Sequence, residues 1–319
     1  MSDENHPGAF GKGPQRSSRL ATAAAIGSIA LWCWSGVCFA AGSRAMGAMP
    51  YLAVSCAVGV ATGVALHLAR GRPVMELVRL PLRVIVAGFF GVALYTVALV
   101  MAVGMASDKD VGQVILINYL WPVCMVLIAM VLLEQKPRAW LAIAGALLGF
   151  GGVVMARGIE TFTRSPSSLL PHAMALAGAF LWALYSVLLR RWNIPEEQGG
   201  STFHFVVCAL MAGAIATARG QWPSIHSLGP STYVWIVFLG VGPIGMGYYF
   251  WEIGVKRGAV HLLALLAYFT PIGSAALVAV FFKEAVSPGL FPGAAMIAAG
   301  AWLGKLAARS PEQKQREAA

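Results

Sequence analysis

The segment Ile117-Asn118-Tyr119-Leu120-Trp121-Pro122 lies inside a long apolar run that ends at Leu133-Glu134. A similar segment, Leu266-Ala267-Tyr268-Phe269-Thr270-Pro271, lies inside a second apolar run that ends at Phe282-Lys283-Glu284. In each copy a proline follows aromatic and polar side chains in the middle of the run. Such a proline frees a backbone carbonyl that lipid cannot satisfy, so both copies are expected to face the protein interior. They are interpreted as equivalent helices of two repeats.

The composition is that of a membrane protein. Of the 319 residues 58% are hydrophobic and 11% are charged, and the mean hydropathy is +0.72. A soluble domain carries about twice that charged fraction. The apolar runs are about 20 residues long, the length that crosses a bilayer as a helix. The sequence therefore predicts an all-α polytopic membrane protein with the lipid bilayer around it.

Ten spans can be counted, and the connections between them are short. The spans run approximately over residues 20–41, 47–68, 82–104, 110–133, 137–157, 169–190, 199–218, 231–254, 258–282 and 288–306. The whole chain is expected to form one membrane domain. Polar tails at 1–18 and 307–319 flank it, and the first of these is expected to be disordered.

The formal net charge is +10, but the basic residues lie in short loops between apolar runs. That distribution is typical of orientation signals and not of a nucleic-acid surface. With the N-terminus in the cytoplasm, 17 of the 23 Lys and Arg residues lie on the cytoplasmic side. The remaining six are Arg44, Lys109, Arg157, Arg164, Arg219 and Lys283. The positive-inside rule thus predicts cytoplasmic termini and a multi-pass protein of the cell inner membrane, with no nucleic-acid partner.

The two halves of the chain repeat each other. Leu31-Trp32 and Leu181-Trp182 are 150 residues apart, as are Glu134 and Glu284, and Pro122 and Pro271 are 149 apart. Because each repeat has an odd number of spans, the second copy must be inverted relative to the first. The sequence predicts a 5+5 inverted-topology repeat over 20–157 and 169–306, an architecture that places a site at the bilayer midplane.

These features resemble the drug/metabolite transporter superfamily with its paired EamA-type repeats. The residues that carry the resemblance are the proline segments that end at Glu134 and Glu284, followed by the glycine-rich final spans at 145–152 and 293–304. The resemblance implies an α-helical transporter whose third, fourth, eighth and ninth spans line a central cavity. More narrowly, Asn118–Pro122, Tyr268–Pro271 and Trp182–Tyr185 are similar to segments of exporters of aromatic amino acids. Outward transport of such amino acids is implied by this narrower resemblance only.

The two prolines are candidate hinges. Pro122 and Pro271 occupy matched positions, and a matched pair of bends favours gating over a static kink. Asn118 lies one turn before Pro122, so both share a face. An uncharged amide in mid-membrane can bind a substrate carboxylate or ammonium, or it can simply join two helices. Both roles remain open.

Aromatic side chains are the main candidates for substrate binding. Their faces suit a planar substrate, although packing between helices explains many such residues equally well. The candidates are Trp32, Tyr95, Tyr119, Trp121, Trp182, Tyr185, Tyr248, Tyr249, Trp251 and Tyr268. His261 shares a helix face with Tyr268 and is a candidate for proton coupling or carboxylate binding, with an ordinary solvated histidine near the cytoplasmic end of the span as the plainer explanation. Glu252 is a second coupling candidate, with pairing to Lys256 as the plainer explanation.

The function predicted from these patterns is export of small amphipathic metabolites, most specifically aromatic amino acids, by alternating access. The first alternative is a carrier of drug-like cations or other metabolites, and the second is a structural or assembly protein. An enzyme is not expected, because HExxH, GxSxG and paired intramembrane carboxylates do not occur, and a Walker A motif is missing too. The five cysteines show no ligand spacing, so no metal, disulfide or cofactor is predicted. Gly145-x-x-x-Gly149 and Gly300-x-x-x-Gly304 are expected to pack within one monomer, with a homodimer contact as the alternative.

Overall fold

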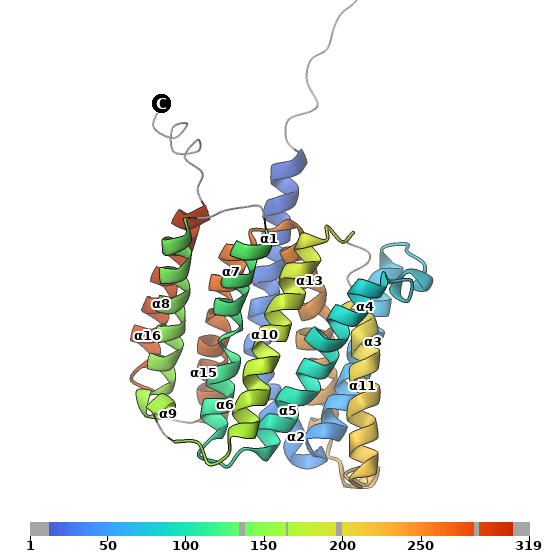
Figure 1. Cartoon of the computed structure of the whole chain (residues 1–319). Helices are drawn as coiled ribbons and strands as arrows, with labels where there is room; N and C mark the ends of the chain where they lie inside the picture. The colour runs from blue at the N-terminus through green and yellow to red at the C-terminus, as the bar shows by residue number, and fades with distance from the viewer. Residues whose placement is uncertain (1–12, 134–137, 164, 196–199, 284–286, 309–319) are drawn as a thin grey trace, which may run out of the picture.

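The computed structural model describes residues 13–133, 138–163, 165–195, 200–283 and 287–308, and this part of the chain contains no strand (Figure 1). The first repeat contains α1 (Gly13–Cys33), α2 (Ser35–Met46), α3 (Ala48–Ala69), α4 (Leu82–Gly88), η2 (Phe89–Leu94), α5 (Tyr95–Met105), α6 (Val111–Asn118), α7 (Trp121–Leu132) and α8 (Ala139–Arg157). The second contains α10 (Leu169–Arg191), α11 (Ser201–Ala218), α12 (Pro230–Leu239), η5 (Gly240–Gly247), α13 (Tyr248–Arg257), α14 (Val260–Leu266), α15 (Phe269–Phe282) and α16 (Leu290–Ala308). The short elements η1 (Val74–Leu77), α9 (Ile159–Thr163) and η4 (Ile225–Ser227) lie in the connections.

The helices combine into ten segments that are long and apolar enough to cross a membrane, as the sequence predicted. Most boundaries agree with the expected ones to within about two residues. The first span ends at Met46 and not at 41, because the helix continues until Gly47, whose φ of +83° ends it. The eighth span ends at Arg257 and not at 254, since its basic last turn remains helical.

The helical bundle has two faces at its ends. The first helix begins and the last helix ends at the same face, which we call the terminal face, and the other is the opposite face (Figure 1). The connection between α3 and α4 also lies at the terminal face. Orientation in the membrane stays a prediction from the distribution of basic residues.

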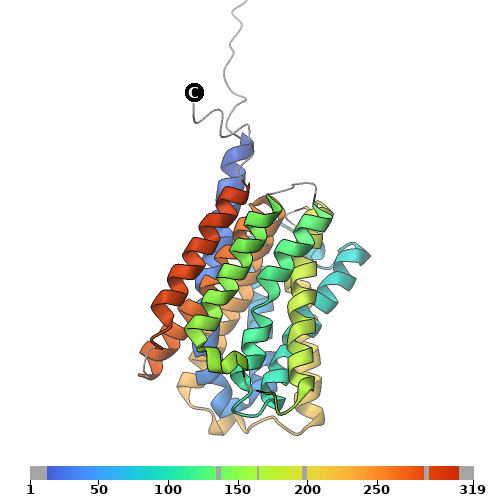
Figure 2. The same ribbon diagram turned by 60° about the vertical axis from the view of Figure 1, so that its left-hand side comes forward.

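The packing of the helices has the symmetry of a two-fold repeat. Helix α3 of the second span packs against α11 of the seventh, and α8 of the fifth packs against α16 of the tenth (Figures 1 and 2). Helix α1 of the first span packs against α13 of the eighth. The equivalent of α1 is α10, which packs against α5 of the third span. Each repeat thus makes the same contacts with the other, as expected for equivalent halves.

The α8–α16 contact brings two backbones together without side chains between them. A Cβ on Gly300 would lie 2.5 Å from the Gly145 carbonyl oxygen, and one on Gly293 would lie 2.4 Å from the Gly152 oxygen. Only glycine permits such an approach. The expectation that the glycine faces pack within one chain is confirmed.

Both proline segments interrupt their spans. Helix α6 ends at Asn118 and α7 begins at Trp121, while α14 ends at Leu266 and α15 begins at Phe269. Each proline lies in the first turn of the new helix, where its missing N–H is tolerated. The break therefore precedes the proline at Tyr119–Leu120 and at Ala267–Tyr268. Glu134 and Glu284, which follow these spans, lie outside the described residues.

The third and eighth spans each contain a π-helical segment near their middle, η2 and η5. A shift of 150 residues carries Phe89 to Leu239, directly before η5, so the two segments occupy matched positions. The eighth span contains Pro243, which permits a bend, whereas the third span contains no proline between residues 82 and 105. Short π-helical segments inside α-helices are frequent at functional sites, and these two pack against helices of the other repeat, η2 against α10 and η5 against α3.

Candidate functional site

A cavity of about 540 Å³ lies between the two repeats. Several of its lining residues, including Ser43, Ala48, Gly104 and Arg157, lie within a few residues of helix ends at the opposite face. Other lining residues, including Trp182 and Pro243, lie near the middle of their spans. The cavity thus occupies the half of the bundle toward the opposite face. Its volume is in the range of small-molecule sites.

The third, fourth, eighth and ninth spans contribute residues to the cavity wall. The first, second, fifth, sixth and seventh spans contribute as well, so the cavity is built from more helices than expected. Seven of the sequence-predicted site residues line it: Trp32, Tyr95, Asn118, Tyr119, Trp121, Trp182 and Tyr248. They come from both repeats and from five different spans.

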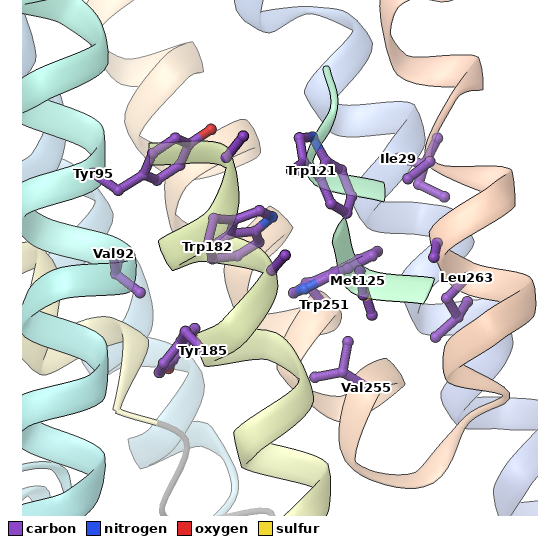
Figure 3. Packing of buried hydrophobic residues seen from close by; sticks show 14 of the residues in the cluster. Ile29, Val92, Tyr95, Trp121, Met125, Trp182, Tyr185, Trp251, Val255 and Leu263 are labelled. Atoms are coloured by element: carbon purple, nitrogen blue, oxygen red, sulfur yellow. The ribbon is translucent and has the colours of Figure 1, made fainter. Parts of the chain in front are cut away.

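Trp182 is the centre of an aromatic cluster at the inner end of the cavity. Its ring centroid lies 5.2 Å from that of Tyr248 and 5.9 Å from that of Tyr95, with which it is stacked. Trp32 and Trp121 lie at 6.0 and 6.2 Å, both in edge geometry. Figure 3 shows Tyr95, Trp121 and Trp182 facing one another from three helices. These rings form an aromatic floor of the cavity, of the kind that packs against planar rings.

The π segment of the eighth span helps to fix this floor. A π turn leaves backbone groups outside the regular helical pattern, and such groups need partners inside a membrane protein. The indole Nε1 of Trp32 donates a hydrogen bond of 3.0 Å to the carbonyl oxygen of Pro243. A Cβ on Gly247 would lie 2.8 Å from the same Nε1, so glycine leaves room for the indole.

On the terminal side of the floor the bundle is filled by side chains. Trp251 is fully buried and lies 6.2 Å from Trp182, and its Nε1 donates to Ser186 Oγ at 3.2 Å. Tyr185 is 1% exposed and donates its hydroxyl to Glu252 Oε1 at 2.8 Å (Figure 3 shows Tyr185 and Trp251). These contacts join α10 to α13. Trp251, Tyr185 and Glu252 therefore close the terminal side and do not line the cavity.

Three further predicted site residues also lie outside the cavity wall. Tyr249 interacts with Arg70, whose guanidinium lies 4.9 Å from its ring centroid. Tyr268 is fully buried and packs against Gly149 of α8. His261 is 5% exposed within α14.

Few polar side chains line the cavity. Asn118 Oδ1 and Thr270 Oγ1 are buried and have no hydrogen-bond partner among the described residues. Asn118 was predicted from the sequence as a site residue, whereas Thr270 was not, although it directly precedes Pro271 in the repeated segment. Arg157, which lines the cavity, was predicted from the sequence only as an orientation charge.

A link between the repeats lies at the opposite face. The backbone N–H of Ser167 donates to Asp110 Oδ2 at 3.0 Å, across the connections that precede α6 and α10. Burial acts to raise the pKa of Asp110, but hydrogen bonds from Ser107 and Ser167 outweigh it, so the pKa lies below its ordinary value. Asp110 is thus held as an anion just before the fourth span.

The chain matches the family model described as "EamA-like transporter family" twice, over residues 19–158 and 169–304. It is similar to a protein of Ancylobacter novellus named aromatic amino acid exporter YddG, with 33% identity over 90% of this chain and 98% of that one. Proteins of the same name from Escherichia coli and Salmonella typhimurium are 30% and 28% identical, each over 72% of this chain and 80% of theirs.

A solved structure, described only as "Crystal structure of protein", superposes with a TM-score of 0.80 and is 31% identical, covering 91% of this chain and 99% of that one. The two family matches coincide with the two halves whose helices pack symmetrically, and together they span most of the sequence. The chain belongs to the EamA-like transporter family, as a multi-pass membrane transporter and not an enzyme.

Proposed function

We propose that this protein exports aromatic amino acids across the cell inner membrane, using the cavity between the repeats as its substrate site. The observation that carries the proposal is the Trp182 cluster at the floor of a cavity of about 540 Å³. Offset-stacked and edge-to-face contacts with aromatic rings contribute about 0.5–1.5 kcal/mol each beyond area burial. The similarity to three proteins named as aromatic amino acid exporters supports the same substrate class.

The shape of the cavity supports transport by alternating access. Its wall reaches helix ends at the opposite face, whereas Trp251, Tyr185 and Glu252 fill the terminal side. If the termini are cytoplasmic, as the basic residues predict, this arrangement corresponds to an outward-facing state. Inverted repeats exchange conformations to produce the inward-facing state.

The proposed hinges are the two breaks before Pro122 and Pro271 and the two π segments. Backbone at these points lacks part of the regular i→i−4 hydrogen bonding, so rotation there disrupts fewer bonds than elsewhere in a helix. The breaks occupy matched positions in the two repeats. A coordinated change at both would tilt the half-helices α7 and α15 around the same cavity.

The position of Glu252 argues against a carrier of drug-like cations. Such a carrier needs an anion in contact with the substrate. Glu252 accepts a hydrogen bond from Tyr185 behind the aromatic floor and does not line the cavity. A coupling role for Glu252 or His261 remains a separate proposal, and facilitated diffusion requires neither.

Counterflow in proteoliposomes tests the proposed function. Vesicles loaded with unlabelled phenylalanine, tryptophan or tyrosine should take up the labelled amino acid faster than protein-free vesicles. The assay should be repeated with a pH gradient across the membrane. Uptake that is independent of the gradient identifies a facilitator, and gradient-dependent uptake identifies proton coupling. If none of the three amino acids is taken up, the substrate class is wrong.

A further inference from the structure

Arg157 is a charged residue in the wall of the cavity. It is the last residue of α8, is half-buried, and lines the cavity together with Asn118, Tyr119 and Thr270. Its Nε is buried and has no hydrogen-bond partner in the described part of the chain. Among the same residues, no carboxylate forms an ion pair with it. A buried guanidinium nitrogen without a partner is costly unless a ligand supplies the missing acceptor.

The equivalent position in the second repeat has a different environment. A shift of 148 residues aligns Gly145 with Gly293 and Gly152 with Gly300, and it aligns Arg157 with Lys305. Lys305 is exposed near the end of α16 at the terminal face, where an orientation charge is expected. Arg157 does not follow this pattern, because it lies in the cavity wall.

Several polar side chains lie in the cavity wall together with Arg157. The hydroxyl of Tyr119 interacts with the Arg157 side chain, and the amide of Asn118 interacts with the hydroxyl of Tyr95. The Oδ1 atom of Asn118 and the Oγ1 atom of Thr270 remain as buried acceptors, with no partner that the described residues provide. One cavity therefore contains a cationic side chain whose Nε has no partner among the described residues, together with two neutral acceptors that also have none.

We propose that Arg157 binds the α-carboxylate of the substrate and that Asn118 Oδ1 and Thr270 Oγ1 accept hydrogen bonds from its α-ammonium group, an assignment that rests on the proposed function. A guanidinium forms two parallel hydrogen bonds with a carboxylate, which gives both affinity and orientation. The carboxylate then lies toward the opposite face, and the aromatic ring points to the Trp182 cluster. The substrate class is an α-amino acid with a free carboxylate.

This assignment resolves the role of Asn118, for which binding of either charged group was open. An amide oxygen is a suitable acceptor for an ammonium group, and the carboxylate already has a stronger partner in Arg157. It also gives the site a means to reject amines, because a substrate without a carboxylate would leave the guanidinium unpaired next to a second positive charge.

Binding to the purified full-length protein, followed by intrinsic tryptophan fluorescence, tests the assignment. The ligands are phenylalanine, phenethylamine, which lacks the carboxylate, and 3-phenylpropionate, which lacks the ammonium group. The wild type should bind phenylalanine roughly 10- to 100-fold more tightly than phenethylamine, as expected for hydrogen bonds to a charged group. In Arg157→Gln this preference should disappear, while Arg157→Lys should keep part of it. In Asn118→Leu the preference for phenylalanine over 3-phenylpropionate should fall instead.

Arg219→Gln is the matched control, because it removes an exposed arginine near the same face outside the cavity wall. A monodisperse elution profile shows that each variant is folded, and Arg157→Lys replaces Arg157→Gln if the latter aggregates. If Arg157→Gln, or Arg157→Lys in its place, discriminates between phenylalanine and phenethylamine as well as the wild type does, the assignment of Arg157 is overturned. If the wild type binds and transports no aromatic amino acid, the proposed function itself fails.

Discussion

Glu252 and Trp251 are adjacent in α13 but contact different kinds of residues. Trp251 adds its ring to the aromatic cluster, 5.2 Å from Trp32 and 5.5 Å from Trp121. Glu252 accepts the Tyr185 hydroxyl and interacts with the charge of Lys256, whose Nζ donates to the Pro195 carbonyl oxygen at 3.1 Å. The Glu252 carboxylate thus belongs to a set of polar contacts that joins α13 to α10 on the terminal side of the cavity floor.

Replacement of Glu252 separates this structural role from substrate binding. Glu252→Gln keeps an oxygen that can accept the Tyr185 hydroxyl, so counterflow of aromatic amino acids should stay close to the wild-type rate. Glu252→Ala leaves that hydroxyl without its acceptor and should destabilise the protein by about 1–3 kcal/mol. Thermal unfolding in detergent and counterflow measure the two effects. Loss of transport in a folded Glu252→Gln variant would contradict the structural role and favour a coupling role for Glu252.

The contact between the fifth and tenth spans illustrates how glycine sets the distance between two helices. Gly300→Ala would place a Cβ 2.5 Å from the Gly145 carbonyl oxygen, which forces α8 and α16 apart. Such overpacking costs about 1–3 kcal/mol. Gly213→Ala in α11 is the matched control, because its Cβ would meet only side-chain atoms at 3.9 Å. Melting temperatures in one detergent should fall for Gly300→Ala and stay unchanged or rise for Gly213→Ala. Equal shifts in the two variants would contradict the close approach of α8 and α16.

The interrupted helices show what could and could not be predicted from sequence. The breaks before Pro122 and Pro271 follow from the covalent structure of proline and were therefore expected. The break at Trp34 in the first span and the π segment at Phe89–Leu94 involve no proline. Such irregularities depend on contacts with other helices, and neither hydrophobicity nor local composition encodes them.

Tyr248 and Tyr249 show the same limit within the site. Adjacent helical residues point about 100° apart, and sequence reasoning placed both in the cavity. Tyr248 lies 5.3 Å from Trp32 in the cavity wall, whereas Tyr249 contacts Arg70. The π segment η5 directly precedes α13. The aromatic character of the site was thus predictable, but the face of each helix that reaches the cavity was not.

At the scale of the whole molecule, the orientation of the protein in the membrane decides which side of the membrane the cavity faces. Asp108→Cys at the opposite face should react with a membrane-impermeant maleimide on intact cells, because the basic residues place that face outside. Arg191→Cys at the terminal face should react only after the cells are permeabilised. The native cysteines in the described spans are buried or half-buried, and the unsubstituted protein gives the background. The reverse labelling pattern would invert the proposed direction of transport.

Aromatic substrates are proposed to bind at the floor formed around Trp182. The most direct test of this proposal is counterflow of labelled tryptophan by Trp182→Leu beside Trp302→Leu, because Trp302 is 61% exposed on the outside of the bundle. Loss of two aromatic contacts of about 0.5–1.5 kcal/mol each should weaken apparent affinity roughly tenfold in Trp182→Leu. Trp302→Leu should behave as the wild type. Wild-type affinity in Trp182→Leu would contradict the account.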